Sequence, residues 1–299
     1  MKTGFVALVG LPNAGKSTLV NSIIGEKVGI VSKKPQTTRR HVIGVYTDDE
    51  SQICFMDTPG RVKSEAGLNL FLHQELESVI RKSDACLAVL NIDAKKIEDL
   101  LEIAELARSA QKPWACVINK TDLDSTVGDG LREMKLRQAL FGYRVPVISC
   151  AAIKDEKKVQ RGLLPVLKDL LPESKSPLFD GEIYTTQTQR DLIAEIVREK
   201  CFEYLHQEVP YGIAVKVLKY DENSKIPKIF VEIIVAKENF LSMVVGHGGQ
   251  MIKRIGASSR IEFEQTLGQK VYLETHVKVK KDWTKNPEIM RELGYVVTD

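Results

Sequence analysis

Residues 10–17 have the types and the spacing of a phosphate-binding loop. They read Gly-Leu-Pro-Asn-Ala-Gly-Lys-Ser and match the pattern G-x-x-x-x-G-K-[ST] in full. An apolar run at residues 5–9 predicts a strand before the loop, and a helical pattern begins near Lys16. The first N–H groups of a helix have no partner within it and therefore attract phosphate. This context favours a polyphosphate site over a chance match.

Two side chains of the loop have specific roles in this prediction. Lys16 reaches the terminal phosphates as a point charge, and the Ser17 hydroxyl holds a magnesium ion. The residues predicted to bind the phosphates and the metal here are Gly10, Asn13, Ala14, Gly15, Lys16, Ser17 and Thr18.

The segment Asn119-Lys120-Thr121-Asp122 follows a predicted strand and has the pattern N-K-x-D. A carboxylate at Asp122 accepts from both N1–H and the 2-amino group of guanine, whereas adenine has an acceptor at N1 and no 2-amino group. In this pattern Asn119 lies beside the purine and ties the pocket to the phosphate loop, while the stem of Lys120 packs on the base. The segment therefore predicts GTP or GDP as the ligand.

The segment Asp57-Thr58-Pro59-Gly60 ends another predicted strand, at residues 52–56. Asp57 is predicted to hold magnesium through water, and the Gly60 N–H to meet the γ-phosphate only when it is present. The alternative is a plain proline-glycine turn. With Lys16 and Thr38, these two residues form the predicted catalytic set.

A basic stretch at residues 33–40 contains Thr37 and Thr38. One of the two hydroxyls is expected to complete the magnesium shell in the GTP state, and we assign this role to Thr38. The predicted metal ligands are then Ser17, Thr38 and Asp57. A solvated basic loop is the alternative.

The residues Ser149, Cys150 and Ala151 end the last predicted strand of this half, at residues 145–150. They are expected to supply a backbone N–H to O6 of guanine. Without the other motifs they would be read as a buried strand end.

These motifs require a scaffold that brings strand ends together. Up to about residue 171, apolar strand-like runs alternate with helical patterns, which predicts an α/β, doubly wound, mostly parallel sheet with helices on both faces. Ligands bind such sheets at the carboxyl ends of the strands, where each motif falls. We predict a nucleotide domain at residues 1–172, a linker rich in proline and small polar residues at 173–182, and a smaller α+β domain at 183–299.

The composition and the first residues argue against a membrane-spanning, a secreted and a disulfide- or zinc-based protein. The chain has 299 residues, of which 43% are hydrophobic and 28% charged, and no apolar run is long enough to span a bilayer. The first residues lack a signal-peptide pattern, so a cytoplasmic location is expected. Five dispersed cysteines without a C-x-x-C pair indicate reduced thiols rather than a zinc or disulfide framework.

The second half carries the pattern of a KH domain of the bacterial type. A capping box at Thr188 opens a helix, strands are predicted at residues 213–219 and 229–235, and a further strand at 270–280. Between them, Gly246-His247-Gly248-Gly249 separates two helical runs. Such a G-x-x-G loop lets protein and nucleic-acid backbones approach closely; a glycine-rich helix cap is the alternative.

Charge supports a nucleic-acid partner for this half. Residues 240–285 contain eight basic and four acidic residues, although the whole chain has a net charge of only +3. The predicted RNA-binding residues are Gly246, His247, Gly248, Gly249, Lys253, Arg254, Lys278, Lys280 and Lys281.

The first half resembles translation-factor-like GTPases, and the whole chain resembles the Era family. The latter resemblance includes residues 36–39 (QTTR), 196–200 (IVREK), 208–211 (EVPY) and 277–283 (VKVKKDW). It implies a GTPase that uses GTP, GDP and Mg²⁺ and hydrolyses slowly. It also implies binding through the KH domain to the single-stranded 3′ end of small-subunit (16S) ribosomal RNA, and a role in 30S subunit maturation. A monomer, sometimes peripheral at the inner membrane face, is expected.

The chain departs from this family at three positions. His247 stands where lysine is usual, so RNA binding is expected to tighten as pH falls. Arg61 replaces an apolar residue and is interpreted as an exposed switch residue rather than an arginine finger. Cys150 replaces alanine, which leaves the register of the guanine-contacting loop open by one residue.

Two other functions are compatible with parts of the pattern. In the first, the chain is an RNA-binding assembly factor for which GTP is a structural ligand. In the second, Lys278, Lys280 and Lys281 bind lipid; the strand-like alternation of this segment and the absence of an amphipathic helical pattern disfavour this alternative.

Overall fold

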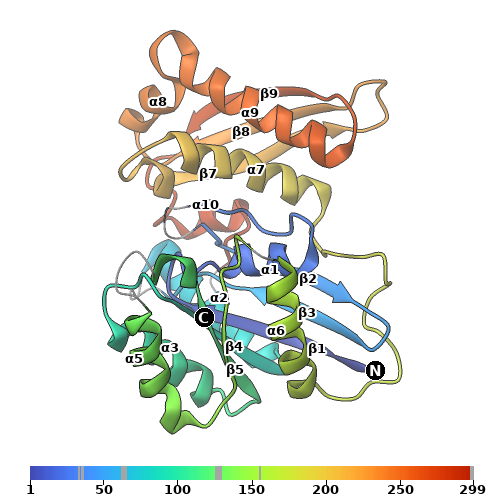
Figure 1. The fold of residues 1–299 in the computed structure, drawn as a ribbon. Coiled ribbons are helices and arrows are strands. Elements are labelled where there is room, and N and C mark those ends of the chain that lie inside the picture. Colours follow the sequence, from blue (N-terminus) through green and yellow to red (C-terminus); the bar gives the residue numbers. More distant parts are fainter. Residues whose placement is uncertain (33, 35–36, 62–65, 125–129, 155, 297–299) are drawn as a thin grey trace. The chain divides into compact units, whose positions relative to one another are not determined.

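A computed structural model describes residues 1–32, 34, 37–61, 66–124, 130–154 and 156–296 (Figure 1). The chain divides into two compact units. Unit 1 comprises Met1–Lys63 and Leu72–Thr186, and unit 2 comprises Ser64–Phe71 and Gln187–Asp299. Within the described part of the chain, no helix combines the length and the apolar character that crossing a bilayer requires.

Unit 1 contains a six-stranded sheet in the order β2-β3-β1-β4-β5-β6. All neighbouring strands pair in parallel except β2 and β3, which are antiparallel. The predicted mostly parallel α/β sheet is therefore confirmed. The strands are β1 (Lys2–Gly10), β2 (Val42–Thr47), β3 (Ser51–Asp57), β4 (Ala85–Asn91), β5 (Trp114–Asn119) and β6 (Val147–Ser149).

Helices cover both faces of this sheet. Alternate residues of β1 point to opposite faces, as Val6 and Leu8 pack with α1 and α6, whereas Ala7 and Val9 pack with α2, α3 and α5. Burial on both faces explains why the central strands read as continuous apolar runs. The helices are α1 (Lys16–Ile24), α2 (Gly67–Lys82), α3 (Ile97–Ser109), α5 (Leu131–Leu140) and α6 (Glu156–Leu170), with short 3₁₀ turns η1 (Thr121–Leu123) and η2 (Phe141–Tyr143). The part of α2 up to Phe71 is assigned to unit 2.

Strand β2 was not predicted from the sequence. It lies at one edge of the sheet, and Gly44 in its middle packs against α1. A Cβ at Gly44 would lie 2.5 Å from Ile24 Cδ1 and 2.8 Å from Val20 Cγ1. The glycine that interrupts the apolar run is therefore needed for close packing of the strand on the helix.

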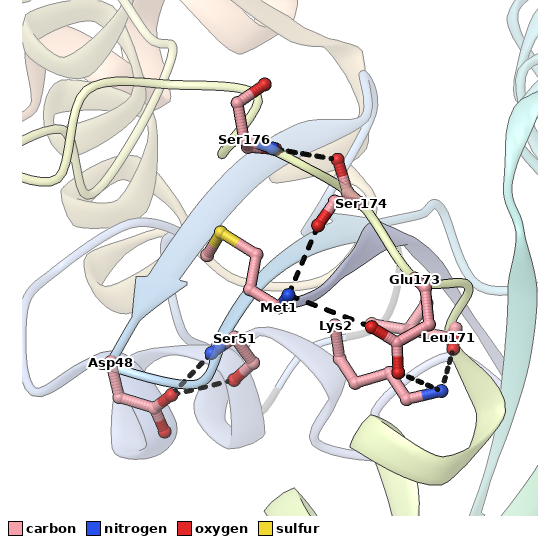
Figure 2. Close-up of polar contacts among 8 residues, drawn as sticks. All are labelled: Met1, Lys2, Asp48, Ser51, Leu171, Glu173, Ser174 and Ser176. Atoms are coloured by element: carbon pink, nitrogen blue, oxygen red, sulfur yellow. Dashed lines mark hydrogen bonds and ion pairs between the residues drawn. The ribbon is translucent and has the colours of Figure 1, made fainter.

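The segment after α6 turns back along the start of β1 (Figure 2). Lys2 Nζ donates to Leu171 O at 3.1 Å and lies 3.5 Å from Glu173 Oε1, while Ser174 N donates to Met1 O at 2.9 Å. Further along, the Gln52 side chain accepts from Leu178 N. Much of the stretch predicted as a linker is thus attached to unit 1.

The hairpin between β2 and β3 is closed by Asp48. Its Oδ1 accepts from Glu50 N at 3.0 Å and from the backbone N–H and the hydroxyl of Ser51 at 2.8 and 3.0 Å (Figure 2 draws the Ser51 contacts). An aspartate that accepts from residues two and three positions ahead fixes a tight turn.

Unit 2 contains a three-stranded sheet in the order β7-β8-β9, with β7 antiparallel and β9 parallel to β8. Helices α7 and α9 pack together, and α7 packs on β7. The elements are α7 (Gln189–Tyr204), η3 (Val209–Gly212), β7 (Ile213–Asp221), β8 (Lys228–Val235), α8 (Glu238–Val245), η4 (His247–Gly249), α9 (Gln250–Leu267), β9 (Tyr272–Val279) and α10 (Pro287–Glu292).

The predicted capping box at the start of α7 is confirmed. Thr188 Oγ1 accepts from Asp191 N at 3.2 Å, and Asp191 Oδ2 accepts from Thr188 N at 3.3 Å. The buried face of α7 then packs on the strands through Ile193, Ile196 and Val197. The sequence pattern therefore predicted both the first residue and the buried face of this helix correctly.

Candidate nucleotide-binding site

A cavity of about 690 Å³ opens at the carboxyl ends of β1 and β5. It brings together the phosphate loop, the segment before β2, Gly60 and the N-K-x-D segment. The lining residues are Pro12, Asn13, Ala14, Gly15, Lys16, Ser17, Thr18, Ile30, Val31, Ser32, Thr37, Thr38, Gly60, Asp93, Asn119, Lys120, Asp122, Leu123, Ala152 and Ile153.

The glycines of the phosphate loop have steric reasons to be glycine. Gly15 has φ +85° and caps α1, and a Cβ there would lie 2.5 Å from Asn119 Nδ2. A Cβ at Gly10 would lie 2.7 Å from Val89 O, although Gly10 itself does not line the cavity. One glycine therefore permits the turn into the helix, and the other permits the close approach of β1 to β4.

Lys16 is buried and held inside the loop. Its Nζ donates to Leu11 O at 3.2 Å and to Gly10 O at 3.4 Å. Burial lowers the pKa of Lys16 to about 8, an effect that the nearby charge of Asp57 opposes. The ammonium thus sits where polyphosphate oxygens would give it stronger anionic partners than two carbonyls.

The three predicted magnesium ligands converge on one point. Ser17 Oγ donates to Asp57 Oδ2 at 2.5 Å, Thr38 Oγ1 donates to the same oxygen at 3.1 Å, and the two hydroxyl oxygens lie 3.1 Å apart. Thr37 instead donates to Lys34 O at 2.9 Å. The hydroxyl directed toward Asp57 therefore belongs to Thr38.

This cluster is chemically suited to Mg²⁺. The second carboxylate oxygen of Asp57 is buried and has no hydrogen-bond partner among the described residues. Burial raises the pKa of Asp57, although the positive charge of Lys16 opposes this effect. A magnesium ion prefers such hard oxygen ligands and uses few protein groups, since phosphates and water complete its shell. The hydroxyls of Ser17 and Thr38 supply two further oxygens.

The Gly60 backbone lines the cavity, whereas the Arg61 side chain is directed to α3. Gly60 lines the cavity, and a Cβ on it would lie 2.5 Å from Pro12 N, so its backbone passes directly over the phosphate loop. The Arg61 N–H donates to Gly10 O at 3.1 Å, and its guanidinium donates to Glu102 on α3. Arg61 does not line the cavity.

Asn119 connects three loops of the site. Its Nδ2 donates to Ala14 O at 3.0 Å, while its Oδ1 accepts from Lys120 N at 2.8 Å and from Ala152 N at 3.2 Å. The Cys150 thiol also donates to Oδ1, at 3.6 Å. The tie from the N-K-x-D segment to the phosphate loop thus has the form that the sequence predicted.

Asp93 is a residue of the site that sequence reasoning missed. It lines the cavity and accepts from Lys120 Nζ at 3.0 Å and from Asn91 Nδ2 at 2.6 Å. Although burial alone would raise the pKa of Asp93, these hydrogen bonds lower it. The signal that could have found it is its position just beyond a buried parallel strand.

Asp122 also lines the cavity, and Lys154 Nζ lies 3.4 Å from its Oδ2. Cys150 and Ala151 line a second cavity of about 260 Å³, which shares Asp122 with the first. The walls of the main cavity at this end are Ala152 and Ile153 rather than the predicted Ser149, Cys150 and Ala151. The Ser149 hydroxyl instead makes hydrogen bonds to Glu133 and Arg137 of α5.

The predicted glycine loop of unit 2 lies between α8 and α9. Gly246, Gly248 and Gly249 have φ of +73°, +56° and +77°, and a Cβ at Gly248 or Gly249 would meet no atom within 4 Å. His247 is exposed at its tip. Open space beside the backbone is what close approach of a ligand requires.

The predicted RNA-binding lysines do not all lie near this loop. Lys253 and Arg254 are exposed in the first turns of α9, and the Arg254 guanidinium lies 4.2 Å from the ring centre of Tyr204. In β8 and β9 the odd-numbered residues join the core beneath α7 and α9, so Lys278 and Lys280 belong to the other face of the sheet. Lys281 follows β9 and is exposed.

Lys278 and Lys280 are engaged in ion pairs on their own face. Lys278 Nζ lies 3.7 Å from Glu232 Oε1, and Lys280 pairs with Glu292 of α10, which also pairs with Lys216. The alternation of side chains between the two sheet faces thus separates these lysines from the glycine loop.

A phosphate loop joined through Asn119 to an aspartate-bearing base pocket, on a doubly wound sheet, defines a P-loop GTPase domain. The three-stranded unit with its glycine loop between two helices has the form of a KH domain. Family models agree: residues 5–120 match "50S ribosome-binding GTPase" and residues 208–284 match "KH domain".

Whole-chain comparisons extend this result. GTPase Era of Neisseria meningitidis (serogroup C) is 35% identical over 294 residues, which cover 98% of this chain and 94% of that protein. A crystal structure of an Aquifex aeolicus Era variant bound to GDP and AlF₄⁻ matches with a TM-score of 0.88 and 34% identity, covering 99% of this chain and all of that one. A structure of Era with MgGDPNP and nucleotides 1506–1542 of 16S ribosomal RNA matches with the same score, identity and coverage.

The chain therefore belongs to the Era family of GTPases. It uses a guanine nucleotide and Mg²⁺ and hydrolyses GTP to GDP.

Proposed function

We propose that this GTPase is a molecular switch whose nucleotide state controls binding of the single-stranded 3′ end of 16S ribosomal RNA by its KH domain, and that it assists 30S subunit maturation. The observation that carries the RNA proposal is the glycine loop, with open space at Gly248 and Gly249 and with Lys253 and Arg254 exposed just beyond it. The Era complex with nucleotides 1506–1542 of 16S ribosomal RNA supports the choice of partner. Residues 1–172 would provide the nucleotide function and residues 183–299 the RNA function.

At the phosphate end, we assign electrostatic roles to five residues. Lys16 binds the β- and γ-phosphates, while Ser17, Thr38 and Asp57 hold Mg²⁺, whose bound charge would neutralise the phosphate oxygens. The Gly60 N–H is assigned to the γ-phosphate. Because phosphoryl transfer requires mainly positioning and charge stabilisation, these groups suffice without a covalent intermediate.

At the base end, Asp122 selects guanine, and the Lys120 stem packs on the ring. Asn119 holds the phosphate loop and the base loop at a fixed separation. Cys150 N donates to Ile118 O and Ala152 N donates to Asn119, so we assign the O6 contact to the Ala151 N–H between them. Ala151 precedes the wall residue Ala152 and lines the second cavity, which shares Asp122 with the first.

We expect hydrolysis to be slow. Arg61 occupies the position after Gly60, and its guanidinium is directed to Glu102 instead of toward a water beside the γ-phosphate. The rate is then set by how well the segment that carries Thr38 is ordered, or by a partner. Multiple-turnover measurements with and without 30S particles test this: rates equal to the uncatalysed background in both would favour the alternative in which GTP is only a structural ligand.

The RNA proposal is tested by a labelled RNA with the sequence of nucleotides 1506–1542. Gly248→Asp places a negative charge in the open space beside the loop, and we expect at least a tenfold loss of affinity, because the charge repels phosphate at close range. Gly268→Asp is the matched control. Gly268 ends α9, has φ +65° and is equally open, so the change carries the same backbone strain and charge.

Equal losses in both variants would contradict the assignment of the loop as the RNA site.

The same assay tests the predicted RNA contacts of Lys278 and Lys280. Both lysines are ion-paired on the sheet face opposite the glycine loop. We therefore expect that Lys278→Ala and Lys280→Ala weaken RNA binding less than Lys253→Ala does.

We also propose that the protein acts in the cytoplasm as a monomer on the 30S subunit. The support is its family membership and the chemistry of ribosomal RNA as a ligand. Co-sedimentation with 30S particles and analytical ultracentrifugation test these points. Sedimentation with vesicles of anionic lipid, without RNA, tests the membrane association that the sequence resemblance implied.

A further inference from the structure

The Ser149 hydroxyl faces α5 instead of the nucleotide cavity. It donates to Glu133 Oε1 at 2.5 Å and accepts from Arg137 Nη2 at 2.6 Å. The same guanidinium donates through Nη1 to Val147 O at 3.2 Å and through Nε to Glu133 Oε1 at 2.8 Å. One arginine thus holds both ends of the three-residue strand β6.

Strand β6 needs this support more than its neighbours do. It is the edge strand of the sheet, and its ladder with β5 comprises only three residue pairs. Its burial is also incomplete, whereas β4 and most of β5 are fully buried. The loop that leaves β6 carries Ala151, so any movement of the strand displaces the donor that we assign to O6.

Glu133 extends the connection to the other base-binding segment. Its backbone N–H donates to Asp124 Oδ2 at 3.1 Å, and Asp124 lies two residues beyond Asp122. The first turn of α5 therefore contacts both segments that flank the base. Hydrogen-bond selectivity requires donors and acceptors held within a few tenths of an ångström.

We propose that Arg137, held by Glu133, is a positioning residue that sets the recognition of guanine O6. The inference rests on the base pocket proposed above. An i, i+4 ion pair on a helix surface is the simpler interpretation, because Arg137 and Glu133 side chains are 42% and 27% exposed. That interpretation predicts a change in stability alone.

Nucleotide analogues separate the two interpretations. In 6-thio-GDP a sulfur, which accepts hydrogen bonds weakly, replaces O6, while IDP lacks the 2-amino group that Asp122 binds. For Arg137→Ala we expect GDP affinity to fall about tenfold and the preference for GDP over 6-thio-GDP to shrink about fivefold. The preference for GDP over IDP should change less than twofold, because the Glu133–Asp124 contact remains.

Lys135→Ala, an exposed change on the same helix, is the control and should alter neither preference. Arg137→Lys should restore part of the 6-thio-GDP discrimination, because lysine makes one of the two contacts. An equal loss for GDP and 6-thio-GDP in Arg137→Ala, or no loss of GDP affinity, would overturn the proposal. Equal wild-type affinities for GDP and IDP would instead remove the base-pocket assignment, and the proposal with it.

Discussion

The guanidinium of Arg61 donates a hydrogen bond to the carboxylate of Glu102 at 2.8 Å, and neither residue lines the cavity that Gly60 lines. An arginine that neutralises transition-state charge must reach the γ-phosphate. The pairing with α3 gives Arg61 a different role, in which it anchors the end of the segment that begins at Asp57.

Arg61→Ala should therefore change the rate of GTP hydrolysis less than tenfold at saturating GTP and Mg²⁺. Single-turnover phosphate release provides the measurement. Glu102→Gln removes the charge of the partner and should have an effect of similar size, because both changes release the same anchor. A several-hundredfold loss in Arg61→Ala alone, with intact GTP affinity, would restore the arginine-finger interpretation.

A second prediction concerns the pair formed by His41, which precedes β2, and Glu75 on α2. Glu75 Oε1 accepts from the His41 backbone N–H at 3.0 Å and contacts its ring nitrogen. Burial alone would raise the pKa of Glu75, but these contacts, with Arg40 nearby, lower it below its ordinary value of 4.5. A lowered carboxyl pKa stabilises the fold above that ordinary value and ceases to do so as pH falls through the folded-state pKa.

Glu75→Gln should accordingly lower the free energy of unfolding by about 1 to 2 kcal/mol at pH 7 and by less at pH 4. Chemical denaturation of the nucleotide-free protein at both pH values measures the difference. Glu77→Gln serves as the control, because Glu77 is 63% exposed on the same helix. A loss that is the same at both pH values would show that the Glu75 charge does not contribute.

The base pocket predicts a change of nucleotide selectivity. Asparagine at position 122 offers one acceptor and one donor, which suit the N1–H and the 2-carbonyl of xanthine and leave the guanine 2-amino group unpaired. Asp122→Asn should weaken GDP binding at least a hundredfold and strengthen XDP binding. Competition with a fluorescent nucleotide measures both, with Asp169→Asn, an exposed change in α6, as the control.

A fourth prediction concerns His247 at the tip of the glycine loop. His247→Lys places a permanent positive charge there, so this variant should bind the labelled RNA about threefold to fivefold more tightly than the wild type at pH 8, an effect expected from one additional charge near phosphate. His206 is another exposed histidine of unit 2, and His206→Lys is the control, which should change the RNA affinity less than twofold. An equal gain in both variants would contradict a specific role of position 247.

Most of the fold was predictable because the apolar runs in the sequence are the segments that are buried in the sheet. Strands β1, β3, β4 and β5 are mostly apolar runs because both faces of the sheet are covered, and β1, β3 and β5 each end in a recognisable motif. The short helix α10 was missed, although Asn286 caps it and Pro287 occupies its first turn. Both residues are ordinary helix-start signals.

The residues that sequence reasoning could not place depend on contacts between distant segments. Asp93 belongs to no motif and acts through Lys120, 27 residues away. Arg137 is one of several charged residues on α5, and only the register of β6 brings Ser149 to it. Lys280 lies on the outer sheet face, against the unpredicted α10, because of its position in the alternation.

The four contacts of the Asn119 side chain make the two ends of the pocket interdependent. A ligand that moves the phosphate loop at Ala14 also pulls on the amide that holds Ala152, and a base that shifts Ala152 acts back on Ala14. The binding free energies of a nucleoside and of inorganic pyrophosphate, measured separately, should therefore not add up to the binding free energy of GDP. They would add up if the two ends of the pocket were independent. The difference between the sum and the value for GDP measures the coupling free energy that the Asn119 side chain creates between the two ends of the pocket.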